Sequence, residues 1–374
     1  MTYRFDEIAI NSTAKKKPVE SDKFHYVGLE HIDSGSFEIT RWGSDVAPVG
    51  EKLIMQKGDV LFGKRRAYQR KVAIAPFDGI FSAHGMVLRP KEDVICKEFF
   101  PFFLSSNQFM DTAIRISVGG LSPTINWKDL QKQEFELPSV EEQRILAEKL
   151  WAAYELKEAY KKMIAATDEM VKSQFIEMSK AWPVMKLNGH VDIIRGVSYK
   201  PSDVVSSLDA NSVGILRANN IANGEINTNE MVYVDQSRVS DAQRIRIGDI
   251  IVCASSGSQS LVGKAAINKN LTREYAHGAF CLLIRCNNPI LPKYLNIYLH
   301  SALYRNQIES LSCGSNILNI KAGHLTSLDI PIPDIKQQSD FVTIIEQADK
   351  SKFELRQAIE KIDKVMKSLI NDIK

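Results

Sequence analysis

Two stretches of the chain carry apolar residues at steps of three and four, regularly alternating in the second stretch and less regularly in the first, with charged residues between them. Each stretch follows a proline-marked joint, Leu137-Pro138 or Ile330 to Pro333, and contains neither glycine nor proline. The pattern predicts two long helices, residues 141–180 and 336–374. Since a lone helix would leave its apolar stripe in water, we expect the two to pair as an antiparallel coiled coil. The positions expected at the helix-pair or partner interface are Leu150, Ala153, Leu156, Tyr160, Met163, Thr167, Met170, Ile345, Ala348, Lys352, Leu355, Ile359, Ile362, Met366, Leu369 and Ile373.

The regions before these helices are rich in short strand-like runs, such as Lys71–Ala75 and Met86–Arg89, separated by Gly, Pro, Asn and Asp. Helical spacing interrupts them in two patches, residues 98–114 and 292–311. The residues expected on the buried faces of these patches are Phe99, Phe102, Phe103, Phe109, Ile114, Tyr294, Leu295, Tyr298, Leu299, Leu303 and Ile308. Short strands mixed with few helices predict an α+β fold.

The two halves of the chain repeat one another. The matched segments are 29–35 with 218–224, 57–61 with 247–251, 83–85 with 276–278, and 137–143 with 332–338, at offsets of 189 to 195 residues. A repeat of this length is a whole domain plus a helix, and is too long for a solenoid unit. We therefore expect two similar β-rich domains, residues 1–140 and 181–335, each followed by one of the helices.

Composition narrows the class of protein. A chain of 374 residues with 44% hydrophobic and 25% charged residues is typical of a globular protein with two domains. We expect no membrane span and no signal peptide, because no apolar run is long enough. The five cysteines are odd in number and lack C-x-x-C spacing, which favours a reduced, cytoplasmic protein without a zinc site or other metal centre.

Positive charge is concentrated in one segment, although the net charge is only +3. Residues 63–71 hold Lys64, Arg65, Arg66, Tyr68, Gln69, Arg70 and Lys71. Arginine and lysine bind phosphates, and arginine or glutamine can pair with base edges, so the segment is a candidate DNA contact. The alternative is a solvated basic hairpin.

Other candidate contacts are small polar residues. At the matched place in the second half stand Ser255, Ser256, Ser258, Gln259, Ser260 and Lys264, while the turns after the helical patches carry Ser122, Thr124, Ser315 and Asn316. Serine and glutamine can bond to phosphates or base edges, but an ordinary loop or turn has the same composition. We interpret His84 and His277 as core histidines, because neither has a metal-ligand spacing.

This arrangement resembles the specificity subunit of type I restriction–modification systems. The likeness lies in Gly120 to Asn126 followed by Leu137-Pro138 and Gln143, in Gly314-Ser315-Asn316 followed by Asn319, Ile332-Pro333 and Gln338, and in the domain start Trp182 to Leu187. One difference is the Lys15-Lys16-Lys17-Pro18 loop, for which the second half has no counterpart, so we expect the N-terminal edges of the two domains to differ.

The resemblance implies a non-catalytic subunit. Each domain would be a target recognition domain that reads one half of a bipartite, asymmetric site in double-stranded DNA, and the helices would set the spacing. Two adenine-N6 methyltransferase subunits would dock on the helices and recruit the restriction subunits. S-adenosylmethionine, ATP and magnesium would belong to those partners, and this chain would bind no cofactor.

Two other classes of protein are alternatives. An adenine methyltransferase needs an N/D-P-P-aromatic motif and a glycine-rich cofactor loop, but the nearest match is Asn288-Pro289-Ile290 and no G-x-G-x-x-G occurs. The other alternative is a coiled-coil scaffold that binds proteins and does not contact DNA. The cationic segment at residues 63–71 argues against this alternative without excluding it.

Overall fold

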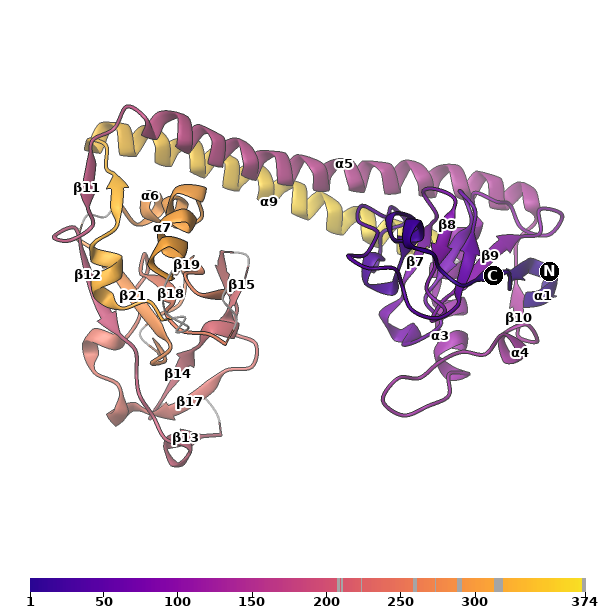
Figure 1. Ribbon diagram of the computed structural model, residues 1–374, viewed down its shortest axis with the longest axis horizontal. Coiled ribbons are helices and arrows are strands. Elements are labelled where there is room, and N and C mark those ends of the chain that lie inside the picture. Colours follow the sequence, from indigo (N-terminus) through magenta and orange to yellow (C-terminus); the bar gives the residue numbers. More distant parts are fainter. Residues whose placement is uncertain are drawn as a thin grey trace. The chain divides into compact units, whose positions relative to one another are not determined.

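The computed structural model describes the whole chain except residues 207–208, 210, 223, 258–260, 273, 288–290, 313–318 and 372–374. It contains two compact units (Figure 1). Unit 1 comprises Met1–Lys161 with Leu355–Lys374, and unit 2 comprises Lys162–Glu354. Each unit therefore joins one strand-rich region to a part of both long helices.

Unit 1 is built from two four-stranded sheets. The first has the order β2-β9-β6-β7, from β2 (Ala9–Ser12), β9 (Met86–Pro90), β6 (Val60–Phe62) and β7 (Val72–Ile74). The second has the order β3-β5-β8-β4, from β3 (Lys15–Lys16), β5 (Lys52–Met55), β8 (Gly79–Phe81) and β4 (Tyr26–Val27). A separate pair joins β1 (Thr2–Arg4) to β10 (Glu134–Glu136) next to α1 (Phe5–Ile8).

The first sheet lies between two cores, which explains why its central strands β9 and β6 carry buried apolar residues on both faces. Along β6, Val60 and Phe62 belong to a large phenylalanine-rich cluster, whereas Leu61 belongs to the cluster beneath the second sheet. Edge-to-face contacts join the rings of Phe103 and Phe135 in the larger cluster. Burying each such side chain contributes about 1.5–3 kcal/mol, so this layer supplies much of the stability of unit 1.

Unit 2 repeats the plan. Its first sheet has the order β12-β21-β18-β19, from β12 (Val191–Arg195), β21 (Cys281–Cys286), β18 (Ile250–Cys253) and β19 (Ala265–Ile267). Its second has the order β13-β17-β14-β20, from β13 (Val204–Val205), β17 (Val232–Asp235), β14 (Ser212–Leu216) and β20 (Tyr275–His277). Two pairs complete it: β11 (Val184–Lys186) with β22 (Asp329–Pro331), and β15 (Ile221–Ala222) with β16 (Glu225–Ile226).

The duplicated α+β architecture is thus confirmed, with one rearrangement. Both units keep a parallel strand pair in the second sheet, β4–β8 and β14–β20, but β5 pairs with β8 whereas its counterpart β17 pairs with β14. At Lys15 to Pro18, β3 has an edge-strand counterpart in β13, but the segments that lead to them differ, since residues 13–14 separate β2 from β3 and residues 196–203 separate β12 from β13.

Each predicted helical patch is two helices. The first patch forms α2 (Phe100–Ser105) and α3 (Asn107–Arg115), and the second forms α6 (Leu291–Tyr298) and α7 (Ala302–Ser312). Ser106 separates the first two and caps α3 by accepting a hydrogen bond from Phe109 N at 3.1 Å. Because the period restarts at each break, Ile114 and Leu303 are exposed rather than buried, at 39% and 38%. Two short helices, α4 (Trp127–Leu130) and α8 (Ala322–Thr326), precede β10 and β22.

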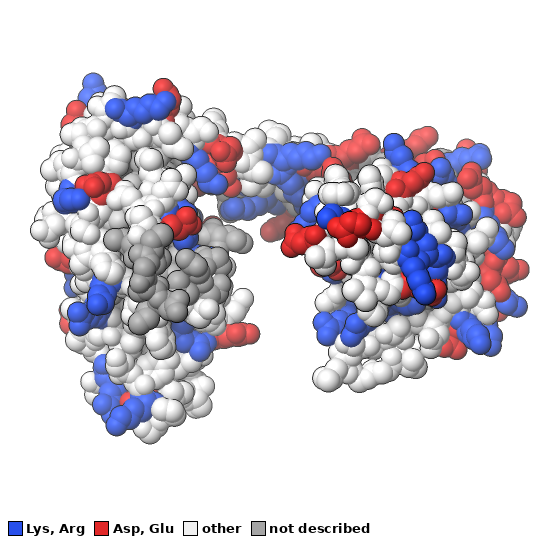
Figure 2. All heavy atoms as spheres, viewed as in Figure 1, with Lys and Arg blue, Asp and Glu red and all other residues white. Residues whose placement is uncertain are grey.

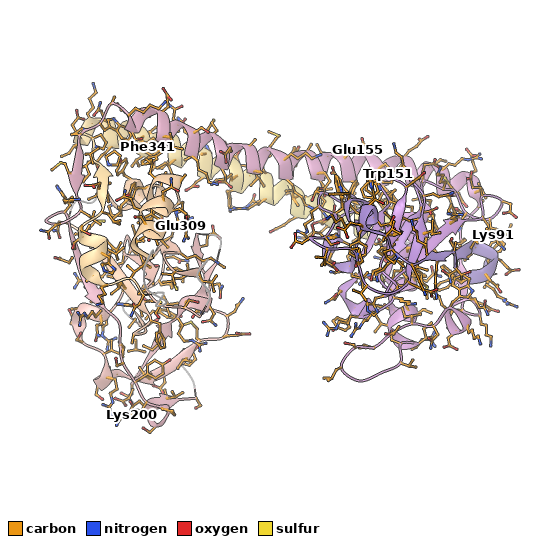
Figure 3. The ribbon with its side chains drawn as sticks, viewed as in Figure 1. Lys91, Trp151, Glu155, Lys200, Glu309 and Phe341 are labelled. Carbon is orange, nitrogen blue, oxygen red and sulfur yellow. The ribbon has the colours of Figure 1, made fainter. Side chains whose placement is uncertain are left out.

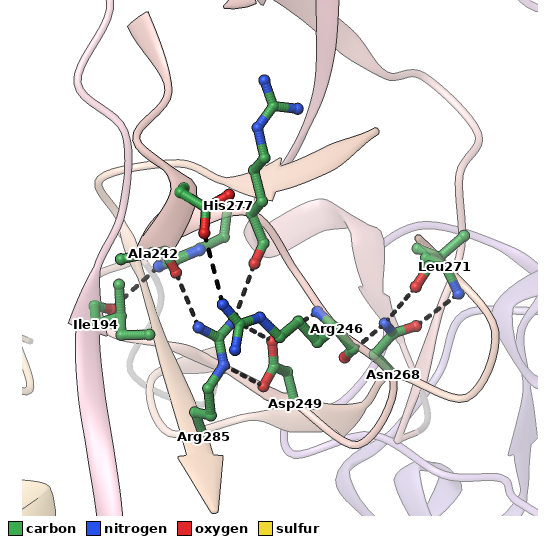
Figure 4. Close-up of polar contacts among 10 residues, drawn as sticks. Ile194, Ala242, Arg246, Asp249, Asn268, Leu271, His277 and Arg285 are labelled. Atoms are coloured by element: carbon green, nitrogen blue, oxygen red, sulfur yellow. Dashed lines mark hydrogen bonds and ion pairs between the residues drawn. The ribbon is translucent and has the colours of Figure 1, made fainter. Parts of the chain in front are cut away.

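The repeated Gly-Asp motif has a structural role. Gly58 and Gly248 adopt φ of 90°, which glycine tolerates best, and the following aspartates close the turn. Asp249 accepts hydrogen bonds from Arg285 at 3.0 and 2.7 Å, as Figure 4 shows, and Asp59 accepts two from Arg89 at 2.6 and 2.9 Å. The motif therefore fastens β18 to β21 and β6 to β9.

The histidine match in the sequence is out of register by three residues. Ser82 N donates to Val27 O in unit 1, and Gly278 N donates to Leu216 O in unit 2. These two hydrogen bonds are equivalent, so His84 occupies the position that corresponds to Phe280, and Phe81 the position that corresponds to His277. His277 is a core histidine, fully buried with its Nε2 donating to Ile194 O at 3.1 Å. The core interpretation of His84 is wrong, because that side chain is exposed.

The two long helices are α5 (Val140–Ser179) and α9 (Ile335–Asn371). In unit 1, Met366 of α9 packs in the cluster that contains Leu150 of α5, and in unit 2, Ile345 of α9 packs with Val171 and Phe175 of α5. The helices therefore pair antiparallel, as expected. Trp151 of α5 packs against the core of unit 1, where its Nε1 donates to Glu98 O at 2.9 Å, and Phe341 of α9 packs in the core of unit 2 (Figure 3).

The residues predicted to face the partner helix do so along α9 but only in part along α5. Along α9, Ile345 and Met366 are buried and Leu355, Ile359, Ile362 and Leu369 are half-buried; Ile373 lies outside the described residues. On α5, Leu150 is buried and Tyr160 half-buried, but Leu156, Met163 and Met170 are 44%, 52% and 52% exposed, so they do not form helix-pair core. The real seam passes through Tyr154, Lys157 and Asp168 to Val171, and the apolar pattern missed it because two of these positions are charged.

Candidate nucleic-acid interface

The cationic segment of unit 1 is a strained turn after β6. Ala67–Gln69 form a short 3-10 helix, and the residues on either side, Arg66 and Arg70, adopt left-handed φ of 57° and 50°. This conformation costs a non-glycine residue about 1–2 kcal/mol, so contacts elsewhere in the unit must hold the turn. The strain fixes the directions of the cations on either side of Tyr68, which is 53% exposed.

The structure brings this turn together with the Ser122–Thr124 segment. Arg65 forms a β-bridge with Thr124, Arg66 N donates to Pro123 O at 2.7 Å, and Arg66 Nε donates to Ser122 Oγ at 3.2 Å. Ile125 N donates to Lys64 O at 3.0 Å. Two candidate segments that are distant in sequence thus form a single surface.

Two of the predicted cations serve the domain itself. Arg70 Nη2 donates to Asn107 Oδ1 at 2.8 Å and to Ser105 O at 3.2 Å, and Lys71 Nζ donates to Leu29 O at 2.6 Å. They anchor the turn against the α2–α3 junction and the loop at Leu29. The half-buried Gln69 donates its backbone N–H to Arg66 O at 2.9 Å, which closes the 3-10 turn.

His84 joins this surface, although sequence reasoning assigned it to the core. Its carbonyl accepts from Arg65 N at 3.2 Å, and its Nε2 lies 3.4 Å from Arg65 Nη1. Burial, followed by the charges of Arg65, Lys64 and Lys52, lowers the pKa of His84. Burial, followed by the charge of Lys15, likewise lowers the pKa of Lys64. The neighbouring cations contribute to both shifts after burial, and cations gathered in this way favour an anion such as a phosphate.

We refer to Lys64, Arg65, Arg66, His84, Ser122 and Thr124 as the unit 1 surface. On the face seen in Figure 2, basic and acidic side chains are interspersed over both units, in keeping with the small net charge. Local backbone contacts therefore locate this surface better than overall charge does.

Unit 2 builds the same backbone framework with other side chains. Ser255 forms a β-bridge with Asn319, Ser255 N donates to Phe280 O at 3.1 Å, and Ile320 N donates to Ala254 O at 2.7 Å. These contacts equate Ser255 with Arg65, Asn319 with Thr124, and Phe280 with His84. We refer to Ser255, Ser256, Phe280 and Asn319 as the unit 2 surface.

The unit 2 surface is polar and apolar where the unit 1 surface is cationic. Ser255 and Ser256 are half-buried, Asn319 is exposed, and the ring of Phe280 is 70% exposed. Lys264 is half-buried, and its carbonyl accepts from Cys253 N at 2.8 Å, as that of Lys71 does from Gly63 N. The predicted Ser258, Gln259, Ser260, Ser315 and Asn316 lie outside the described residues. Sequence reasoning missed Phe280 because the histidine match was out of register.

Within the described ranges, no three His, Cys, Asp or Glu side chains are grouped so as to hold a metal ion. In the same ranges, no helix is both long and apolar enough to cross a membrane. The thiols of Cys96, Cys253 and Cys281 are buried, and burial raises the pKa of each.

Two α+β units that present different side chains on one repeated framework define a duplicated, two-domain protein. The chain belongs to the family of type I restriction modification DNA specificity domains, whose family model matches residues 7–165 and 180–364.

The chain is similar to curated relatives in sequence and to solved structures in fold. The chain is 37% identical to the type I restriction enzyme StySPI specificity subunit of Salmonella potsdam and 35% identical to the EcoKI specificity subunit of Escherichia coli K12. Each match spans 185 residues, which is 48% of this chain and 40% of the relative. A chain from a study of complex assembly and conformational transition of the type I R-M system covers 99% of this chain at a TM-score of 0.57 and 17% identity, with 96% of its own length matched. The type I S subunit from M. genitalium covers 100% at a TM-score of 0.50 and 13% identity, with 96% of its own length matched. The last two similarities concern the fold.

Proposed function

We propose that this chain is the DNA-recognition subunit of a type I restriction–modification assembly. Each unit reads one half of a bipartite, asymmetric site through its surface, and the α5–α9 pair sets the spacer between the halves. The observation that carries the proposal is the matched framework with different side chains, because two different half-sites require different chemistry at equivalent places.

The side chains suit duplex DNA. Arg65 and Arg66 can pair bidentately with guanine or contact phosphates, and the positive potential at His84 and Lys64 favours a polyanion. In unit 2, serine and asparagine can bond to bases or phosphates, and an exposed phenylalanine can contact a thymine methyl group. The chain itself is non-catalytic in this proposal and acts in the cytoplasm.

Chemistry then belongs to the partners. Two methyltransferase subunits, which would use S-adenosylmethionine, dock on the helices, and restriction subunits that use ATP and magnesium join through them. Family membership and the two surfaces favour this role over a coiled-coil scaffold that does not contact DNA.

The test combines a cellular and a binding experiment. Deleting the gene should remove N6-methyladenine from one split, asymmetric motif in the methylome of the source cell. In a gel-shift titration with that motif, Arg65→Glu with Arg66→Glu should weaken binding and reduce the slope of log affinity against log salt by about 0.9 for each phosphate that the variant no longer neutralises.

A matched control uses two exposed cations of the same unit, Lys97 just before α2 and Arg144 in the first turns of α5. Lys97→Glu with Arg144→Glu makes the same change in net charge and should leave binding unaltered. Equal weakening by both double variants would mean that only overall charge matters, and normal methylation by the Arg65/Arg66 variant would exclude the unit 1 surface as the DNA contact.

A further inference from the structure

Two lysines occupy the seam between α5 and α9, where apolar residues are expected. The side chain of Lys157 is 11% exposed and its Nζ lies 2.6 Å from Asp363 Oδ1 in unit 1. The side chain of Lys352 is 15% exposed and its Nζ lies 2.7 Å from Asp168 Oδ1 in unit 2. Both pairs join α5 to α9.

The two ion pairs are one interaction made twice. The offset that matches residues 137–143 with 332–338 also matches Lys157 with Lys352 and Asp168 with Asp363. On each helix the lysine precedes the aspartate by eleven residues. Antiparallel pairing therefore sets the lysine of each helix against the aspartate of the other.

Such ion pairs add little to the stability of a helix pair, but they can select one register of the two helices. The lysine side chains are mostly buried while Asp363 and Asp168 are 49% and 46% exposed, and burying the two ammonium groups costs desolvation energy that leucine at the lysine positions would not pay. A polar residue at a seam position instead selects one register among those that the heptad allows.

The sequence around the pairs penalises the neighbouring registers. Sliding α9 by one heptad in one direction sets Lys157 against Arg356 and Lys352 against Lys161, which brings like charges together. Sliding it in the other direction sets Lys157 against Ile370, which leaves this lysine without an anion across an apolar seam, and sets Lys352 against Phe175, which leaves it only Asp349 of its own helix.

We propose that Lys157–Asp363 and Asp168–Lys352 fix the register of α5 against α9 and thereby restrict the protein to one spacer length between half-sites. The link to the spacer rests on the proposed function, whereas the link to the register does not. These residues are positioning residues, since they act through the helix pair and not by touching DNA.

The charge of Lys352 is secure at neutral pH. Burial lowers the pKa of Lys352 and is the largest single influence, but the hydrogen bonds with Asp168 and Asp349 and the negative charges of these two residues together outweigh burial, so the pKa is raised.

The register can be measured directly by pulsed electron resonance between spin labels at positions 165 and 354. Both positions are exposed and both lie in unit 2, and genetically encoded ketone side chains would carry the labels without touching the native cysteines. The full chain should give one distance. In the four-leucine variant, which combines Lys157→Leu, Asp168→Leu, Lys352→Leu and Asp363→Leu, a second distance should appear, because a one-heptad slip moves the labels by about 10 Å along the axis.

Two controls separate register from charge and from apolar content. Glu169→Leu, Lys172→Leu, Glu177→Leu and Lys180→Leu remove the same charges from exposed pairs within α5 and should leave one distance. Lys157→Asp should disturb the distance, and adding Asp363→Lys should restore it. A single distance in the four-leucine variant at 157, 168, 352 and 363 would overturn the proposal.

The spacer is tested in the assembled complex with DNA that carries both half-sites at a series of separations. The natural chain should methylate one separation, and the four-leucine variant should lose that selectivity. A second distance without loss of selectivity would leave the register role standing and refute its link to the spacer. Failure of the natural chain to act on any split site would refute the proposed function and leave the distance result intact.

Discussion

Protonation of His277 should make unit 2 sensitive to acid, and phenylalanine at this position should remove the sensitivity. His277 is fully buried at the end of β20, beside the Asp249–Arg285 pair (Figure 4). Burial, only partly opposed by the Ile194 carbonyl and the charge of Asp249, lowers the pKa of His277 from 6.5 to about 4. Phe81 is fully buried at the equivalent place in unit 1, so the framework accepts the substituted ring.

The magnitude follows from the two pKa values. A depressed folded-state pKa means that stability is complete above the unfolded value of 6.5 and is lost as pH falls towards about 4, since the unfolded chain takes up the proton first. Between about pH 7 and about pH 4.5 the loss from this group is roughly 2.5 kcal/mol. His277→Phe forfeits a hydrogen bond to Ile194 O, which costs about 1 kcal/mol at neutral pH. The variant should therefore be the less stable protein at neutral pH and the more stable one in acid.

The assay is urea denaturation at both pH values, followed by pulsed hydrogen exchange and mass spectrometry. Peptides from residues 162–354 report unit 2, and peptides from residues 1–161 serve as the internal control within the same molecules. Other acid-sensitive groups affect both proteins equally, so the difference between them isolates His277. Parallel loss of stability in the natural chain and in His277→Phe would refute the reasoning.

Two further predictions concern unit 2. Asp249→Asn leaves the buried Arg285 without its counter-charge and should lower the free energy of unfolding of unit 2 by about 3–5 kcal/mol in the same exchange assay. The control, Glu225→Gln in the exposed Lys269–Glu225 pair, should lower it by less than about 1 kcal/mol. Equal effects of the two variants would contradict the structural role of the Gly-Asp motif. Phe280→Ala should weaken binding to DNA whose unit 2 half-site contains thymine, but not binding to the same DNA with uracil in place of thymine. The control, Ile247→Ala, removes an equally exposed apolar side chain at the other end of β18 and should leave binding to both DNAs unchanged. Equal weakening on thymine and on uracil would exclude contact between Phe280 and the methyl group.

Much of the architecture could be predicted from local pattern. The long helices are encoded by stretches free of glycine and proline, the joints by their prolines, and the two domains by the repeat. The seam of α9 followed from its apolar spacing, because each residue on that side is either apolar or, at Lys352, paired within the seam. Helical periodicity is a property of one element, so one element is enough to reveal it.

The seam of α5 and the candidate surfaces could not be predicted in this way, because they depend on contacts between segments that are distant in the sequence. A charged residue such as Lys157 has the pattern of a surface residue until Asp363 is opposite it, so the seam of α5 was placed one residue too early after Leu150.

The candidate surface shows the same limit. The bridge between Arg65 and Thr124 and that between Ser255 and Asn319 are made by backbone groups, which every side chain allows, so no residue pattern announces them. The sequence by itself determined a duplicated α+β protein with two long helices and a cationic turn. Only the tertiary structure decided that His84 corresponds to Phe280, that Arg70 and Lys71 are anchors, and that α5 meets α9 through two ion pairs, because these are long-range contacts that leave no period along the chain.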